Sequence, residues 1–98
     1  MSLQISGHNI EITPTLHALI TKKFSSLSKH CDQIMSTNVV LSVSKASQKA
    51  EAMLHIPGAN IFAKATSMDM YKTIDMLLEK VIRQLEKHKG KTRVDNGS

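Results

Sequence analysis

The longest regular pattern in the sequence lies between residues 68 and 91. Apolar residues recur there at intervals of three and four: Met70, Ile74, Leu77, Leu78, Val81, Ile82 and Leu85. This spacing predicts an amphipathic α-helix, because successive side chains on a helix are turned by about 100°. Ser67 or Asp69 suits the N-cap of this helix. Gly90 suits its end, since glycine commonly follows the last helical turn.

A second helical pattern starts at Thr13-Pro14, with Thr13 as N-cap and Pro14 in the first turn. Helical spacing then continues to about residue 31 through Leu16, Leu19, Ile20, Phe24, Leu27 and Cys31. Lys23 falls on the apolar arc of this helix. It is either a lysine that lays its stem along the edge of the core, or one that packing holds toward a ligand. The pattern leaves both interpretations open.

Outside the helices the period changes to two, which is typical of strands. Alternation of this kind predicts four strands, at residues 3–7, 37–44, 50–56 and 61–65. Residues 45–49 suit a hairpin connection, and Pro57-Gly58 is a turn signal. The predicted order is β-α-β-β-β-α, an α+β fold with a four-stranded mixed sheet.

The connections indicate how the sheet is assembled. A helix joins the first two strands, so these should be parallel, and the last three should form an antiparallel meander. Each strand has one apolar face, so both helices should cover the same side of the sheet. A chain of 98 residues forms one domain. We assign residues 1–91 to this domain and residues 92–98 to a flexible polar tail.

Composition restricts the classes of partner. The formal net charge is +5, and the isoelectric point is about 9.6, which favours a polyanion such as nucleic acid. No apolar run approaches the roughly 18 residues of a membrane span, and no signal peptide is visible. We therefore expect a cytoplasmic protein with no membrane partner. The single cysteine, Cys31, suits a small buried hydrophobe.

The sequence offers no pattern for catalysis or for a cofactor. The five histidines are scattered, with no metal-binding or Cys-His spacing: His8, His17, His30, His55 and His88. Asp75 and Glu79 stand one turn apart, but Lys72, Lys80 and Arg83 nearby favour ion pairs over a metal site. We predict that the protein is not an enzyme and binds no metal and no cofactor.

Basic residues form a stripe along the long helix. This basic stripe consists of Lys72, Lys80, Arg83, Lys87 and Lys91. It is either a solvated helix face or a binding surface. The acidic residues of the helix lie to one flank of the stripe, and Lys22, Lys29 and Lys23 would stand beside it if the helices pack together. Two such helices would grip phosphates on both sides of a groove. Few aromatic residues are present, so binding should depend on shape and phosphates rather than on base stacking.

Three segments resemble the ribosome hibernation promoting factors, a family also labelled sigma-54 modulation proteins. They are ISGHNIEIT at residues 5–13, Lys23-Phe24, and DMYKTIDMLLEKVIRQLEKHK at residues 69–89. The resemblance covers residues 3–91 and points to the short form of the family. It implies a fold like a double-stranded-RNA-binding domain with an extra first strand. An ordinary domain of that kind fits less well, because its lysine cluster opens the last helix, where this chain has Asp69.

The resemblance also implies a function. The protein would bind ribosomal RNA in the decoding channel of the small ribosomal subunit and block messenger and transfer RNA. It would inhibit translation in stationary phase or stress and, with a separate ribosome modulation factor, promote inactive ribosome dimers. We expect it to be a monomer when free. The alternatives are a protein-interaction modulator of a sigma factor and a small hydrolase, neither of which any motif supports.

Residues implied in RNA binding come from both helices. The family's basic positions correspond to Lys23, Lys80, Arg83, Lys87 and Lys89, and weaker candidates are Lys22, Lys29 and Lys91. The sequence departs from the family pattern at Ser26, where a lysine is common, and at His30-Cys31, where aromatic residues are common. Thr73 replaces a usual alanine. The missing lysine at Ser26 would weaken the contact of the first helix or move it to Lys22 and Lys29.

Overall fold

The computed structural model describes residues 2–31 and 33–97, and for residues 89–97 it describes the backbone alone. The elements follow the predicted order. They are β1 (Ser2–His8), α1 (Pro14–Ser25), the 3-10 helix η1 (Ser26–Lys29), β2 (Ser36–Val43), β3 (Gln48–Ile56), β4 (Ala59–Ser67) and α2 (Met70–Gly97). The prediction of a β-α-β-β-β-α arrangement is confirmed.

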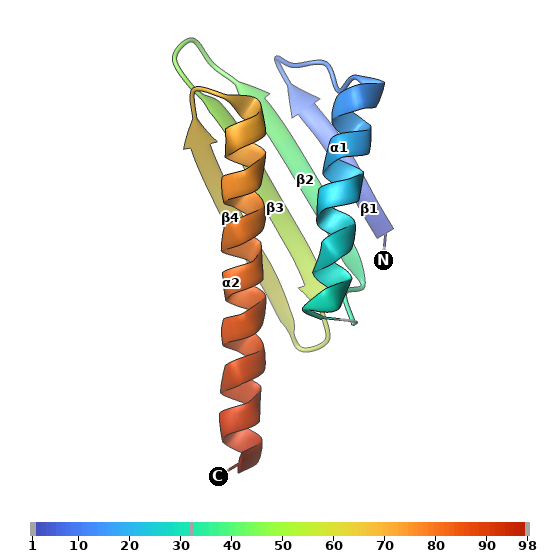
Figure 1. Ribbon diagram of the computed structural model, residues 1–98, viewed down its shortest axis with the longest axis vertical. Helices are drawn as coiled ribbons and strands as arrows, with labels where there is room; N and C mark the ends of the chain where they lie inside the picture. The colour runs from blue at the N-terminus through green and yellow to red at the C-terminus, as the bar shows by residue number, and fades with distance from the viewer. Residues whose placement is uncertain (1, 32, 98) are drawn as a thin grey trace.

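The four strands form one mixed sheet in the order β1-β2-β3-β4. β1 pairs with β2 in parallel, while β2 with β3 and β3 with β4 are antiparallel. α1 provides the crossover between the two parallel strands, as the predicted topology requires. Figure 1 shows α1 lying over the β1–β2 side of the sheet and α2 over the β3–β4 side.

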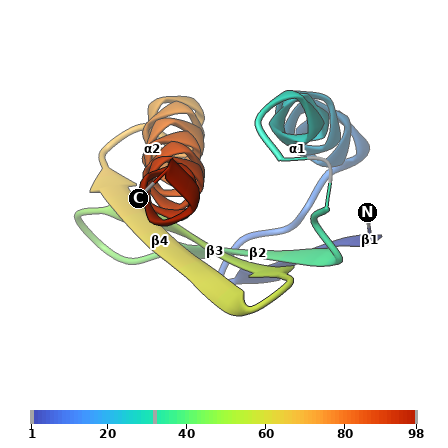
Figure 2. The same ribbon diagram turned by 90° about the horizontal axis from the view of Figure 1, so that it is seen from below.

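Both helices cover the same face of the sheet, as predicted. Seen from below, they stand side by side above it, and the other face of the sheet is uncovered (Figure 2). The core lies between the two layers and contains Phe24 and Ile20 of α1, Ile74 and Leu77 of α2, and Leu41 of β2, all fully buried. Under α2, β3 and β4 present alternate small residues: Ala50, Ala52, Ala63 and Ala65. These allow the helix to approach the sheet closely.

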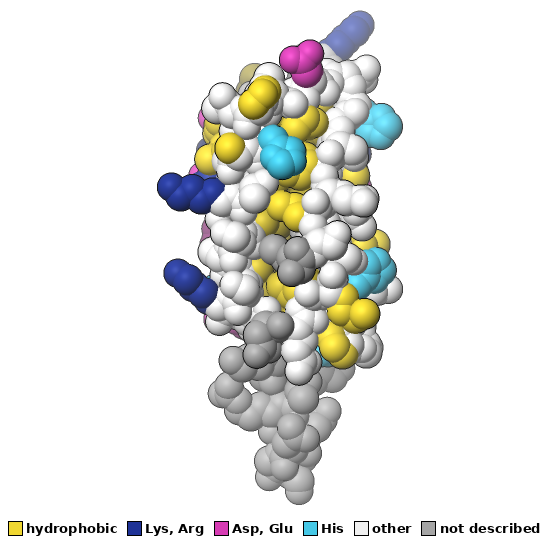
Figure 3. Space-filling model, turned by 90° about the vertical axis from the view of Figure 1, so that its right-hand side faces the viewer, with side chains coloured by type: hydrophobic (Ala, Val, Ile, Leu, Met, Phe, Trp, Pro, Cys, Tyr) yellow, Lys and Arg dark blue, Asp and Glu magenta, His cyan; other side chains and the backbone are white. Residues whose placement is uncertain are grey.

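The flank formed by α1 and β1 is partly apolar. Leu3, Ile5, Ile12 and Leu19 are half-buried and pack against the core. Viewed from this side, hydrophobic side chains run as a strip along the length of the molecule, and basic side chains project from one margin (Figure 3). Cys31 is a half-buried free thiol that packs against the same core.

The first helix is shorter than its apolar spacing predicts. It begins at the expected cap, since the Thr13 hydroxyl accepts the amide of Leu16 at 3.2 Å. After Ser25 the chain tightens into η1, although the sequence predicted one helix to about residue 31. The Ser25 and Ser26 hydroxyls each donate to the carbonyl three residues earlier, at 2.7 Å. Such local side-chain bonds compete with regular helix geometry.

The second helix is capped by Asp69, which resolves the choice between Ser67 and Asp69. The Asp69 carboxylate accepts the amide of Tyr71 at 3.1 Å. The helix continues to Gly97 and does not end at Gly90 as predicted. Glycine inside a helix costs only about 1 kcal/mol relative to alanine and does not break it, and no proline follows. The predicted flexibility of residues 92–98 remains a prediction.

The uncovered face of the sheet is mixed in character. Asn38, Ser42, Glu51 and His55 are half-buried there, and Lys64 and Thr66 are exposed, as the alternation predicted. Phe62 also lies on this face with 45% of its surface exposed. The likeness to a double-stranded-RNA-binding domain is not tested by this arrangement and remains a prediction.

Thr73 fixes the start of α2 to the sheet. Its side chain is fully buried, and its single hydroxyl proton is shared between the Asp69 carbonyl at 2.8 Å and the Gln48 carbonyl at 3.4 Å, with the Ser67 hydroxyl as a further partner. Valine has nearly the same shape but lacks the hydroxyl. We expect Thr73→Val to lower the free energy of unfolding by about 1–2 kcal/mol, because the buried side chain loses its hydrogen bonds to the start of α2 and to β3. Urea denaturation followed by circular dichroism measures this change.

Thr66→Val is the matched control for this experiment. Thr66 is exposed on the uncovered face of β4, so the same substitution there should change stability by less than about 0.5 kcal/mol. Equal effects at the two positions would contradict the assignment of Thr73 as a structural link.

Candidate nucleic-acid interface

The rotation of α2 about its own axis determines where its charges point. Met70, Ile74, Leu77, Val81 and Leu85 are buried against the sheet. The remaining surface of the helix therefore has three parts: a flank toward α1, a flank toward the outer edge of β4, and an outer surface. Each part carries a different set of charged side chains.

Carboxylates occupy the flank of α2 that faces α1. Asp75 forms an ion pair with Lys23 of α1, with its Oδ1 2.7 Å from the lysine Nζ. Three turns further along α2, the Oε2 of Glu86 lies 4.0 Å from Nδ1 of His30, a pair that is charged only when the imidazole is protonated. Asp75 thus forms an ion pair with α1, and Glu86 lies within 4.0 Å of His30, just beyond η1.

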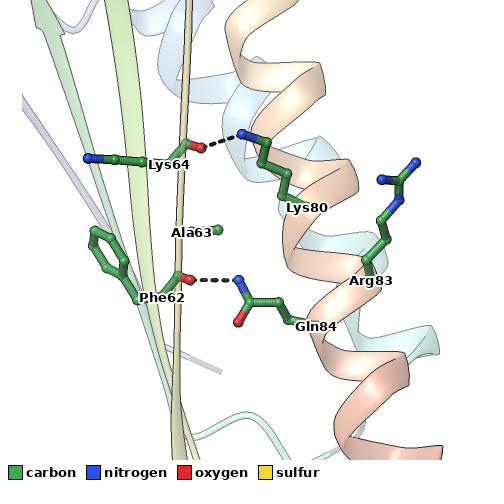
Figure 4. Close-up of a pocket in the computed structure, with 6 residues that line it drawn as sticks. All are labelled: Phe62, Ala63, Lys64, Lys80, Arg83 and Gln84. Atoms are coloured by element: carbon green, nitrogen blue, oxygen red, sulfur yellow. Dashed lines mark hydrogen bonds between the residues drawn. The ribbon is translucent and has the colours of Figure 1, made fainter.

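The flank of α2 toward β4 carries Lys80 and Gln84. The Lys80 ammonium donates to the carbonyl of Lys64 at 2.9 Å, and the Gln84 amide donates to the carbonyl of Phe62 at 2.7 Å. Figure 4 shows both side chains reaching from the helix to the strand, whereas the side chains of Phe62 and Lys64 point away from α2. Together with Ala63 and Arg83 these residues line a shallow cleft. Lys80 therefore has a structural contact as well as a charge.

The outer surface of the helix layer carries the other basic side chains. Arg83 pairs with Glu79 at 3.0 Å, and both are exposed. Lys72 and Lys87 on α2 and Lys22 and Lys29 near the end of α1 are exposed, and none pairs with a carboxylate in the part of the chain that the structure describes. These four lysines can reach a polyanion without breaking an ion pair, whereas Arg83 must share its guanidinium with Glu79 or release it.

The predicted groove between two cationic helices is not formed as expected. The helices do lie side by side, and Lys23 does lie between them. The facing flank of α2 is acidic, however, and Lys80 lies on the opposite flank, next to β4. The physical reason is that the buried arc of α2 fixes its rotation, so the acidic flank already visible in the sequence is the one turned toward α1. The candidate interface consists of two basic strips, Lys22 and Lys29 near the end of α1 and Lys72, Arg83 and Lys87 on α2, with carboxylates between them.

Two of the expected RNA-binding residues lie outside this description. The side chains of Lys89 and Lys91 belong to the segment for which only the backbone is described. Their assignment remains a prediction.

Sequence reasoning missed the partner of Lys23. A lysine on an apolar arc can indicate a neighbouring carboxylate, and Asp75 and Glu86 stand eleven residues apart, about three helical turns, on one side of α2. Read together, these features predict an acidic flank toward the first helix. The Lys23 side chain is 31% exposed and ion-paired with Asp75. Neither interpretation of Lys23 from the sequence included this carboxylate partner.

Neither a metal centre nor a membrane span appears in the described residues. No three His, Cys, Asp or Glu side chains among them gather as metal ligands would. No helix in the same part of the chain is both long and apolar enough to cross a bilayer.

Comparison with known families is decisive at this point. The family described as Sigma 54 modulation protein / S30EA ribosomal protein matches residues 3–93. The chain belongs to this family. Ribosome hibernation promoting factor from Klebsiella oxytoca is 47% identical over 93 residues, covering 95% of this chain and 98% of that protein. The factor of the same name from Escherichia coli strain K12 is 44% identical over 93 residues, with the same coverage. The resemblance to the short hibernation factors is thereby confirmed.

Solved structures agree with the fold. A ribosomal subunit interface protein from Coxiella burnetii superposes with a TM-score of 0.87 at 34% identity, covering 92% of this chain and 99% of that one. The N-terminal domain of Thermus thermophilus Protein Y gives a TM-score of 0.84 at 26% identity, covering 90% and 99%. The relatives are named for ribosome hibernation, so the sigma-factor alternative is not favoured.

The contacts of Lys80 and Gln84 with β4 lead to a prediction about self-association. An uncovered edge strand is a template for pairing with another chain. The Lys80 and Gln84 side chains donate hydrogen bonds to two carbonyls of the edge strand β4, so these carbonyls are not free to pair. We expect Lys80→Ala combined with Gln84→Ala to cause concentration-dependent self-association through β4, measured by sedimentation velocity.

Arg83→Ala is the control for the loss of one positive charge from the same helix. It has no contact with a β4 carbonyl in the described hydrogen bonds, so it should leave the protein's sedimentation unchanged. Sedimentation of the double variant that is independent of concentration would contradict an edge-protecting role.

Proposed function

We propose that this protein is a ribosome hibernation factor that binds the small ribosomal subunit through the phosphates of its ribosomal RNA. The observation that carries the proposal is the exposed basic surface of the helix layer. Its described members are Lys22, Lys29, Lys72, Arg83 and Lys87. Family membership supports the same function, because the relatives are ribosome hibernation promoting factors.

The chemistry of this surface suits phosphate contacts better than base reading. Lysine and arginine side chains neutralise backbone phosphates whatever the sequence of the RNA. Tyr71 on α2 is the one exposed aromatic residue among the described part of the helix layer, and Phe62 lies on the opposite face of the sheet. A single ring gives little base stacking. Recognition therefore depends on where the RNA backbone places its phosphates.

Binding in the decoding channel explains inhibition without catalysis. A folded domain lodged there excludes messenger and transfer RNA by volume, and it needs no reactive group. This matches the prediction that the protein is not an enzyme, in keeping with a family of ribosome-binding factors. We place the protein in the cytoplasm with the ribosomes, as a monomer when free. We further propose that with a ribosome modulation factor it promotes inactive ribosome dimers in stationary phase or stress.

Charge reversal on the outer surface of α2 tests the proposal. Arg83→Glu combined with Lys87→Glu replaces two phosphate-binding groups with repulsive ones. We expect this variant to lose co-sedimentation with purified small subunits in a sucrose gradient, while its circular dichroism spectrum and melting temperature stay unchanged. Each contact removed should also flatten the dependence of log affinity on log salt by roughly 0.7–0.9.

The matched control reverses two lysines on the uncovered face of the sheet, Lys49→Glu with Lys64→Glu. It changes the net charge by the same amount but leaves the helix layer intact, and its melting temperature is measured too because Lys49 pairs with Glu51 at 3.6 Å and Lys64 lies opposite Glu51 in the sheet. It should bind small subunits with nearly the affinity of the unaltered protein. If the helix variant binds as well as this control does, the helix layer is not the RNA-binding surface.

A further inference from the structure

Lys23 differs from the neighbouring lysines of α1 and η1. The Lys22 and Lys29 side chains are exposed, whereas that of Lys23 is only 31% exposed and reaches across to α2. Its backbone is fixed in the last turn of α1, where the Ser26 hydroxyl donates to the Lys23 carbonyl at 2.7 Å. Its ammonium lies 2.7 Å from the Asp75 carboxylate. Both ends of this lysine are therefore held.

We propose that Asp75 is a positioning residue that holds the partly exposed Lys23 ammonium between α1 and α2, ready for an RNA phosphate. This inference rests on the proposed function, since it concerns the same binding surface. It assigns to a carboxylate a favourable part in binding a polyanion. It also explains why an acidic side chain stands beside a basic one at the centre of the interface.

The chemistry of the ammonium group permits this arrangement. A lysine ammonium has three N–H donors and no acceptor. Asp75 engages the ammonium from the side of α2, which leaves donors for a phosphate oxygen arriving from solvent. A free lysine loses much of its rotamer freedom when a ligand immobilises it. A lysine already held in place has lost that freedom before binding, so the ligand does not bear this cost.

Simple charge counting makes the opposite prediction for Asp75. A carboxylate repels phosphates, so its neutralisation should tighten RNA binding. The Asp75 side chain is 60% exposed, however, and water and salt screen its effect on phosphates that are not in contact. Its contact with Lys23 at 2.7 Å is short enough to act directly. The direction of the change in affinity therefore distinguishes the two roles.

Glu86 provides a matched control on the same flank of α2. Its side chain is 62% exposed, close to the value for Asp75, and its partner is His30 at 4.0 Å rather than a lysine. Glu86→Gln removes the same charge from the same flank without releasing Lys23. It should leave RNA binding unchanged or slightly tighter.

The test measures binding of six proteins to purified small ribosomal subunits by titration and co-sedimentation. These are the unaltered protein, Asp75→Asn, Asp75→Glu, Glu86→Gln, Lys23→Gln, and the double variant with Lys23→Gln and Asp75→Asn. We expect Asp75→Asn to bind roughly threefold to tenfold more weakly, the order expected when binding must itself immobilise one lysine side chain. In the Lys23→Gln background the same change should have no weakening effect. Asp75→Glu, which keeps a carboxylate within reach, should restore most of the affinity.

The outcomes separate this inference from the proposed function. If the unaltered protein binds small subunits and Asp75→Asn binds equally well or more tightly, as Glu86→Gln does, the positioning role is wrong and the proposed function stands. Weakening that persists in the Lys23→Gln background would also overturn it, because Asp75 would then act through something other than Lys23. If the unaltered protein does not bind small subunits, both fail.

Discussion

Burial of one arc of α2 against β3 and β4 is the constraint on which the rest of the interface depends. Ile74, Leu77 and Val81 are fully buried there, and each such side chain contributes roughly 1.5–3 kcal/mol. An exposed ion pair contributes only about 0–1 kcal/mol. Packing therefore sets the rotation of the helix, and the charged side chains point wherever that rotation leaves them. The alanines of β3 and β4 make this close packing possible.

This constraint divides the charges of one helix among three surroundings. The carboxylates of Asp75 and Glu86 face α1, and Lys80 faces the edge of β4. Arg83 follows Lys80 by three residues, so it is turned by about 60° from it, onto the outer surface. A stripe that is continuous in the sequence thus serves two purposes in the fold. Lys80 donates a hydrogen bond to a carbonyl of the edge strand β4. Lys72 and Lys87 remain exposed and available to a ligand.

Much of the fold could be predicted because each strand alternates cleanly and each helix repeats its apolar residues. The end of α1 could not be predicted from the apolar spacing. It depends on the hydroxyls of Ser25 and Ser26, which donate to backbone carbonyls three residues earlier. The end of α2 was also predicted wrongly, at Gly90. Glycine is common after the last turn of a helix, but it does not prevent the helix from continuing. The basic residues of the candidate interface could be identified from the sequence. Their division into two strips could not be predicted, because it depends on which flank of α2 faces α1.

The two strips impose a geometric condition on any RNA that binds both helices. A line of carboxylates, Asp75, Glu79 and Glu86, separates the basic residues of α1 from those on the outer surface of α2. A flat array of phosphates laid across both strips meets repulsion in the middle. An RNA fold that presents phosphates on two sides of a gap avoids it. Under the proposed function, affinity comes from the lysines and arginines, and a phosphate between the strips is favourable only where Lys23 meets it beside Asp75.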